Sequence, residues 1–167
     1  MKLLIKNGTI VTPEQIYKKD ILIVGEKIRE INKNILYKKN SNNFKIIDAK
    51  GKYIFPGIID AHTHYSMKSL PDIVTADDFY SGSISAAFGG VTTFIDYAEQ
   101  QKGHSIMESF LNRLGEAEGN TVIDYTFHQS VCSLYTEIKK DLEKLKNKGI
   151  SSLKLFTTYK EDGSMLD

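Results

Sequence analysis

The chain has 167 residues, 41% of them apolar, with 22 lysines and arginines against 21 acidic residues and one cysteine. This composition excludes the collagen, coiled-coil and disordered classes, and a net charge of +1 without blocks of like charge leaves no electrostatic surface for nucleic acid or an anionic membrane. Because Cys132 cannot form an internal disulfide and no long apolar run occurs, we expect a cytoplasmic protein, neither exported nor inserted in a membrane.

Short β-branched and aliphatic runs separated by turn residues fill residues 1–55. The runs cover residues 3–5, 9–11, 21–24, 27–28, 44–47 and 53–54. Asn7-Gly8, Gly25 and the polar stretch 38–43 are turn signals between them. We predict a β unit of short antiparallel strands without a helix.

Residues 56–167 alternate between strand-like and helical patterns. Strand-like segments begin near Gly57, Val91, Val122 and Ser152, and an amphipathic pattern fills each gap. This alternation predicts βα units with a parallel sheet. Since a closed (β/α)8 barrel needs roughly 250 residues, four strands and three helices form either a compact open α/β domain or part of a larger barrel.

Capping residues and apolar residues at helical spacing support the prediction of helices between the strand-like segments. The segments 75–78 (TADD) and 105–108 (SIME) have the form of a capping box, and the first predicts a helix over residues 76–88. Ile138, Leu142 and Leu145 form the stripe of the third helix, which Gly149 ends. The charged run 137–148 is expected to be the solvated face of that helix.

Two histidines follow the first predicted parallel strand. Residues two apart in a strand project from the same face, so His62 and His64 can converge on one cation. Catalytic sites of (β/α)8 barrels lie at this carboxyl end of the strands. The alternative is a pair of histidines that merely ends a strand.

The context of the two histidines is more specific than the pair itself. They close the segment 55–64 (FPGIIDAHTH), which resembles the first barrel strand of the amidohydrolase superfamily. Further segments resemble the dihydropyrimidinase and hydantoinase branch and follow in that branch's order along almost the whole chain. These are residues 7–12 (NGTIVT), 75–79 (TADDF), 87–93 (AFGGVTT) and 152–160 (SLKLFTTYK).

The resemblance implies an α/β fold, with the first half of a metal-dependent (β/α)8 (TIM-like) barrel in residues 56–167 and part of a small β-sandwich domain in residues 1–55. It implies two divalent metal ions, expected to be zinc, with His62 and His64 on the more buried ion. Lys154 resembles the family's catalytic lysine, which carbon dioxide converts to a carbamate that bridges both ions. Tyr159 resembles a substrate-binding tyrosine that faces the oxyanion formed during attack.

Lys154 also stands out by itself, because a lysine in a mostly apolar strand is costly unless its charge is removed or paired. The alternatives are that Lys154 lies at an edge and reaches solvent, and that Tyr159 is a surface aromatic residue of a loop. Asp60 could orient a histidine or accept a hydrogen bond at the strand end. Asp96 and His128 are interpreted as structural.

The implied reaction is hydrolysis of a cyclic amide or ureide, the opening of a dihydropyrimidine or hydantoin ring, by a homo-oligomer that is a tetramer in the family. Residues 65–71 depart from the family's Met-Pro-containing loop, which leaves the ring's identity open. The family adds two metal-binding histidines and a proton-shuttling aspartate after the lysine, so we expect the 167-residue chain alone to be inactive. The alternatives are a non-catalytic scaffold or assembly protein of the dihydropyrimidinase-related type and an inactive truncated product.

Overall fold

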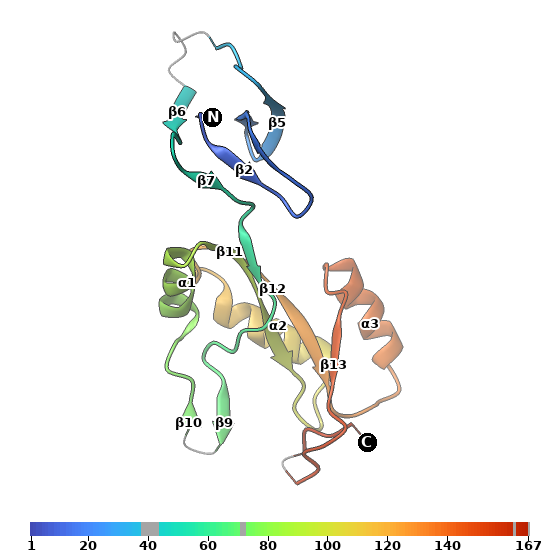
Figure 1. Ribbon diagram of the computed structural model, residues 1–167. Coiled ribbons are helices and arrows are strands. Elements are labelled where there is room, and N and C mark those ends of the chain that lie inside the picture. The colour runs from blue at the N-terminus through green and yellow to red at the C-terminus, as the bar shows by residue number, and fades with distance from the viewer. Residues whose placement is uncertain (38–43, 71–72, 162, 167) are drawn as a thin grey trace. The chain divides into compact units, whose positions relative to one another are not determined.

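The computed structural model describes residues 1–37, 44–70, 73–161 and 163–166. The chain divides into two compact units, Met1–Pro56 and Gly57–Asp167 (Figure 1). The turn predicted over residues 38–43 lies outside the described residues. Within the described part of the chain, no helix is long and apolar enough to cross a membrane.

The first unit consists of two small β-sheets. Its strands are β1 (Lys2–Lys6), β2 (Thr9–Val11), β3 (Ile16–Lys18), β4 (Asp20–Val24), β5 (Lys27–Asn32), β6 (Phe44–Asp48) and β7 (Tyr53–Ile54). One sheet has the strand order β5-β4-β1-β6 and the other has the order β3-β2-β7. Leu4, Ile10 and Ile21 are its most buried large side chains. The predicted β unit without a helix is confirmed for the described residues.

Two strand pairs of this unit contradict the prediction of antiparallel strands only. β1 pairs with β6 and β2 pairs with β7 in parallel, whereas the pairs β1–β4, β4–β5 and β2–β3 are antiparallel. A hairpin leaves a turn signature in the sequence, but pairing between segments far apart in the chain leaves none. The short strand β3 was missed because Ile16 and Tyr17 stand between charged and polar residues and form no aliphatic run.

Asp20 fixes two turns of this unit. Its buried carboxylate accepts hydrogen bonds from the backbone N–H groups of Asn7 (3.2 Å) and Ile35 (3.1 Å). Asn7 and Asn34 adopt left-handed φ angles of 64° and 55°, a region in which asparagine is enriched. The carboxylate therefore holds the backbone beside two turns that the strand ladders alone do not fix.

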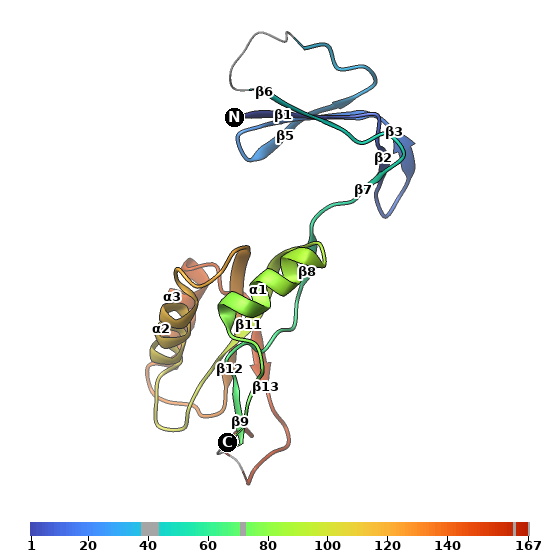
Figure 2. The same cartoon turned by 90° about the vertical axis from the view of Figure 1, so that its left-hand side faces the viewer.

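The second unit is a parallel sheet covered by three helices (Figures 1 and 2). The strands β8 (Ile58–Asp60), β11 (Val91–Glu99), β12 (Asp124–Val131) and β13 (Leu153–Leu155) follow one another in the sheet, all in parallel. The helices are α1 (Phe79–Phe88), α2 (Ile106–Ala117) and α3 (Ile138–Asn147). A curled parallel sheet with helices on one face is part of a (β/α)8 barrel. The predicted order of strands and helices is confirmed.

The core of this unit lies between the sheet and the helices. Strand residues alternate between faces, so Phe94 and Ala98 of β11 and Phe127 of β12 point toward the helices. Phe79 of α1 and Phe110 of α2 pack against them, and Phe79 and Phe94 are almost fully buried. The opposite face of the sheet is therefore free to carry polar side chains.

The start of α2 was predicted correctly, and the start of α1 was not. Ser105 caps α2 by accepting a hydrogen bond from the backbone three residues on. In α1 the capping box joins Asp78 and Ser81, with N–H to oxygen distances of 2.7 and 3.1 Å, rather than beginning at Thr75. The Thr75 hydroxyl instead accepts a hydrogen bond from the N–H of Met67 at 2.9 Å.

A short hairpin lies in the segment that was predicted as a loop. β9 (Lys68–Leu70) and β10 (Ile73–Val74) pair in antiparallel fashion. Pro71, which the predicted loop included, lies outside the described residues. The hairpin brings Met67 and Lys68 to the carboxyl end of the sheet, where both line cavities together with Glu99 of β11.

Tyr135 links α2 to α3. Its hydroxyl donates a hydrogen bond to Oδ2 of Asp141 (2.8 Å) and accepts one from the backbone N–H of Ile106 (3.2 Å). Burial and the hydrogen bond to Asp141 raise the pKa of Tyr135 to about 12. The neutral phenol is therefore the form that this contact stabilises.

The change Tyr135→Phe keeps the ring and removes only the hydroxyl. We expect it to lower the free energy of unfolding of the full chain by about 1–2 kcal/mol, because a carboxylate and an N–H each lose a partner. Urea unfolding followed by circular dichroism measures this difference. Tyr80→Phe on the exposed surface of α1 is the matched control, and an equal loss in both variants would contradict the assigned role.

Candidate metal centre

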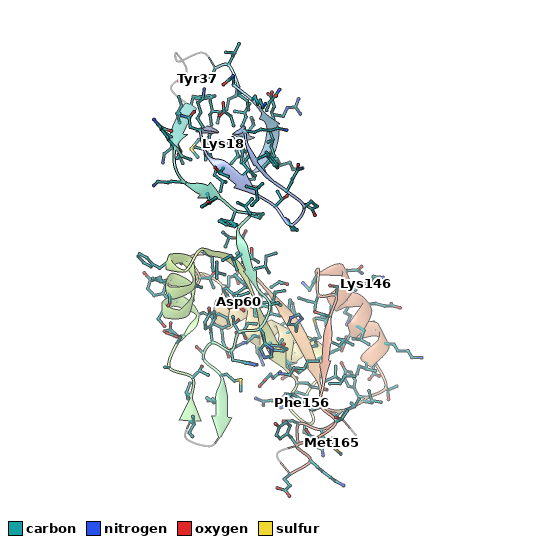
Figure 3. All side chains as sticks on the ribbon, in the orientation of Figure 1. Lys18, Tyr37, Asp60, Lys146, Phe156 and Met165 are labelled. Carbon is teal, nitrogen blue, oxygen red and sulfur yellow. The ribbon has the colours of Figure 1, made fainter. Side chains whose placement is uncertain are left out.

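The segment His62-Thr63-His64 follows β8, which ends at Asp60 (labelled in Figure 3). Thr63 donates its N–H to the carbonyl of Ile95 in β11 at 3.2 Å, so the segment keeps the alternation of a strand although it is not one. The Nε2 atoms of His62 and His64 lie 3.0 Å apart, and Thr63 between them is buried. Both imidazoles therefore face one common point.

Asp96, which lies inside β11 rather than at its end, holds the other side of this segment. Its Oδ2 accepts hydrogen bonds from the Thr63 hydroxyl (3.1 Å) and the Tyr65 N–H (2.9 Å), and its Oδ1 accepts one from the Tyr97 N–H (2.7 Å). The carboxylate is fully buried. Asp96 thus anchors the residues that alternate with the two histidines and sets the direction in which those histidines point.

Arg113 of α2 supplies the charge that allows Asp96 to be buried. Its Nε and Nη2 atoms donate to Oδ1 of Asp96 at 3.1 and 2.6 Å, and Nη2 also donates to the carbonyl of Tyr65. The guanidinium lies 4.5 Å from the ring centroid of Phe79. Since removing one partner of a buried ion pair costs about 3–5 kcal/mol, this contact ties α2 firmly to the segment after β8.

Two rows of side chains cross the inner face of the sheet. Tyr97 of β11 pairs in register with His128 of β12. Two residues further along, Glu99 pairs with Ser130, and Ser130 pairs with Lys154 of β13. Residues in register on neighbouring strands point to the same face of a sheet. The second row therefore presents a carboxylate, a hydroxyl and an amine side by side.

Tyr97 is the ring around which the candidate ligands gather. Its centroid lies 4.9 Å from the ring centroid of His62 and 4.8 Å from that of His64, which stacks on it at 20°. The Nζ atom of Lys154 lies 4.1 Å from the same centroid. Tyr97 therefore brings both histidines and the lysine of the predicted site around one buried ring.

His128 and Asp60 make backbone contacts around the histidine pair. The Nε2 of His128 lies 3.0 Å from the carbonyl oxygen of Ala61, and its Nδ1 contacts the Ser152 hydroxyl. Oδ1 of Asp60 accepts a hydrogen bond from the N–H of His62 at 3.2 Å. Both side chains thus fix the backbone of the segment rather than the imidazole rings.

Tyr159 lies in the loop after β13 and contacts Phe156 rather than the histidines. The two ring centroids are 5.7 Å apart in an edge-to-face arrangement. Phe156 and Met165 form a bridge beyond the end of β13, where Figure 3 labels both. Tyr159 is 61% exposed and has a left-handed φ of 65°. The structure therefore brings it to the edge of the site and not to its centre.

Sequence reasoning did not single out Tyr97, Arg113 or Ser130. Each belongs to a residue type that is common in cores and on helices, and none lies in a motif with metal-binding spacing. The available signal for Tyr97 and Ser130 was the two-residue alternation of their strands, which places both on the face opposite the apolar core. Arg113 had no such signal, because its partner lies in another element.

The histidine pair fits one end of a transition-metal site. Two Nε2 atoms 3.0 Å apart can both bind one ion at about 2.0–2.1 Å. Burial and then the charge of Lys154 lower the pKa of His64, which favours the neutral imidazole that binds metal. Among the described residues, no group of three or more His, Cys, Asp or Glu side chains could hold an ion. These residues therefore supply two imidazoles and the lysine.

The sequence profile of the amidohydrolase family matches residues 53–163, which include both histidines and Lys154. The chain belongs to the amidohydrolase family.

Similar family members are hydantoinases and dihydropyrimidinases. D-hydantoinase of Geobacillus stearothermophilus is 43% identical over 162 residues, covering 96% of this chain and 33% of that protein. Dihydropyrimidinase of Dictyostelium discoideum is 34% identical over 166 residues, covering 99% of this chain and 32% of that protein. The crystal structure of dihydropyrimidinase from Brevibacillus agri NCHU1002 superimposes with a TM-score of 0.88 and 39% identity, over 100% of this chain and 35% of that one. The chain thus spans about a third of the length of these relatives.

The facing Nε2 atoms of His62 and His64 predict that both imidazoles contribute to any binding of Zn²⁺ by the chain. Replacing either by alanine should weaken binding about ten-fold or more, because loss of a mere outer-shell partner already costs about 10–100-fold. Competition with a chromophoric chelator measures the affinity. His104→Ala is the comparison variant, since His104 pairs with Glu108 at 2.9 Å and does not face the other two histidines in the Nε2 pair. Unchanged zinc affinity in His62→Ala and His64→Ala would remove the pair from the site.

Proposed function

We propose that the complete protein to which this chain belongs hydrolyses a C–N bond of a cyclic amide or ureide, opening a hydantoin or dihydropyrimidine ring. The observation that carries the proposal is the facing Nε2 pair of His62 and His64, which shares the Tyr97 ring with Lys154. The similarity to proteins named D-hydantoinase and dihydropyrimidinase supports it. A non-catalytic scaffold of the same fold would not require His62, His64 and Lys154 together.

The proposal includes two divalent metal ions, expected to be zinc, with His62, His64 and Lys154 as the ligands from this chain. Such ions, when bound, polarise a carbonyl oxygen and lower the pKa of water. The neutral amine of Lys154 would add to carbon dioxide, forming an N–C bond and releasing one proton. The resulting carbamate has two oxygens, which suits a side chain that must face two cations. The histidines provide only nitrogen ligands and keep their orientation through the contacts of Thr63.

Tyr159 is the proposed substrate-binding residue of this chain. A phenol hydroxyl can donate a hydrogen bond to the oxygen that gains charge when the ring carbonyl is attacked. The left-handed backbone of Tyr159 supports this role, because conformations of this kind cost about 1–3 kcal/mol and cluster at functional sites. Its exposed ring leaves the hydroxyl accessible to a substrate.

Two expectations about the whole protein belong to the same proposal. We propose a homo-oligomer, a tetramer by the family resemblance, located in the cytoplasm. Light scattering of the complete protein measures the first, and cell fractionation with an antibody to this chain measures the second. A monomer or a membrane-bound pool would contradict the respective expectation.

The complete protein, loaded with zinc or manganese, is expected to open hydantoin and dihydrouracil to the carbamoyl amino acids. Lys154→Ala should lower kcat/KM by about 100-fold or more, at least the effect of removing one preorganised electrostatic group. Mass spectrometry of the product and the zinc content of the protein are the measurements. Lys139→Ala, an exposed lysine of α3, is the matched control. A folded, metal-loaded protein that opens neither ring would overturn the proposal in favour of a scaffold.

The 167-residue chain by itself is expected to open neither ring. Two imidazoles and one lysine supply part of a two-metal centre, and the resemblance assigns the proton-shuttling aspartate to no residue of this chain. Ile58, Ile59, Leu153 and Leu155 on its outer strands are about half exposed or more, which favours association. Assay of the purified chain with added metal measures this. Turnover of about 1–1000 per second, the ordinary range of enzymes, would contradict the expectation.

A further inference from the structure

Ser130 of β12 has a buried hydroxyl without a hydrogen-bond partner. The residue is 6% exposed, and within the described ranges its Oγ atom is closed to water and has no partner. Buried hydroxyls in folded proteins nearly always have a partner, and an unpaired one is destabilising. Because water cannot reach this hydroxyl, the missing partner has to come from a neighbouring side chain.

Register gives Ser130 two neighbours on the inner face of the sheet. Glu99 of β11 lies on one side and Lys154 of β13 on the other. The Glu99 carboxylate is an acceptor that is already present, yet no hydrogen bond joins it to Ser130 in the part of the chain that is described. A protonated lysine amine has donors only, so it cannot accept the hydroxyl proton. The missing acceptor is therefore a group that the unmodified Lys154 lacks.

The amine of Lys154 lies over the strand that carries Ser130. Its Nζ atom is 4.1 Å from the ring centroid of Tyr97 in β11, although Lys154 belongs to β13 and β12 runs between these two strands. The same atom is 4.7 Å from the ring centroid of Phe156. Among the described residues it forms no hydrogen bond and no ion pair. A group added to Nζ therefore extends over β12, on the face where Ser130 lies.

A carbamate on Lys154 fits this place. It adds two carboxylate-like oxygens, which are acceptors with about two lone pairs each. One lone pair of an oxygen can face an ion while the other accepts a hydrogen bond. A cavity of about 360 Å³ that is lined by Glu99, Ser130 and Phe156 leaves room beside the amine for the three added atoms.

We propose that the Ser130 hydroxyl donates a hydrogen bond to a carbamate oxygen on Lys154 and so positions that carbamate. This inference rests on the proposed function, from which it takes the carbamate. When the neutral amine adds to carbon dioxide, the Nζ–C bond forms and one N–H proton leaves to solvent, while Ser130 keeps its own proton. Ser130 is thus a positioning residue that favours the modified lysine over the unmodified one.

Carbon dioxide uptake by the complete protein tests this role. Free zinc is held constant by a chelating buffer, and nuclear magnetic resonance follows the carbamate while isotopically labelled bicarbonate is raised. We expect Ser130→Ala to need about ten-fold more bicarbonate for half occupancy, the size of one hydrogen bond to a charged group. Ser85→Ala on the exposed surface of α1 is the matched control and should titrate like the unchanged protein.

A conservative variant distinguishes positioning from packing. Ser130→Thr keeps a hydroxyl and should restore most of the affinity for carbon dioxide, whereas a role in packing alone would not follow the hydroxyl. Circular dichroism shows whether each variant folds. If Ser130→Ala does not fold, a crystal structure of the unchanged, metal-loaded protein decides. It should place Oγ of Ser130 about 2.5–3.0 Å from a carbamate oxygen, and a hydrogen bond to Glu99 instead would overturn the inference.

The outcomes separate this inference from the proposed function. Equal bicarbonate titrations of Ser130→Ala and the unchanged protein overturn the role of Ser130 and leave ring opening intact. A protein that carries the carbamate but opens neither ring overturns the function, and the titration still decides the role of Ser130. If Lys154 takes up no carbon dioxide at any bicarbonate concentration, the inference on Ser130 is overturned, whereas ring opening is judged by its own product.

Discussion

The buried ion pair between Asp96 and Arg113 is the contact on which the geometry of the site depends. A carboxylate with no exposure to water must have its charge balanced and its oxygens hydrogen-bonded, and here the donors come from three different elements. Arg113 belongs to α2, Tyr97 to β11, which also carries Asp96, and Thr63 and Tyr65 to the segment after β8. Satisfying one acid therefore brings three parts of the chain into a fixed relationship.

Tyr65 extends this relationship into the core. Its ring packs edge to face on Phe94 at 5.0 Å and lies against α1 at Gly82. A Cβ atom at Gly82 would approach Cε1 of Tyr65 to 2.2 Å, so only glycine leaves room for the ring there. The hydrophobic core thus holds the ring of Tyr65, while the Asp96 carboxylate holds the backbone of Tyr65 and the hydroxyl of Thr63. Packing and electrostatics together determine where His62 and His64 lie.

Local patterns in the sequence were sufficient for the arrangement of strands and helices in the second unit. Each βα unit carries its own two-residue and helical periodicities. Ser105 marks the beginning of α2, and Gly149 follows the end of α3. Thr75 was misassigned as the cap because Thr75, Asp77 and Asp78 stand close together and each is a residue type that caps helices. The Asp78 box formed, and Thr75 was used by the hairpin.

The remaining features depend on contacts between distant residues, which single-sequence patterns do not contain. The parallel pairing of β1 with β6 is one case. At the candidate site, the spacing of His62 and His64 was sufficient to predict that they converge, whereas the ring between them and Lys154 was not predictable. Tyr97 carries no motif, and its importance follows only from the register that places it beside His128.

The stacking of His64 on Tyr97 has a thermodynamic consequence for ion binding. The His64 imidazole is already confined, by the Tyr97 ring on one side and by the anchored Thr63 backbone on the other. Ordering a free side chain on binding costs about 0.5–1.5 kcal/mol, and here that loss of rotational freedom has occurred during folding. If the proposed ion binds, ordering of the His64 side chain should contribute little to the entropy of binding.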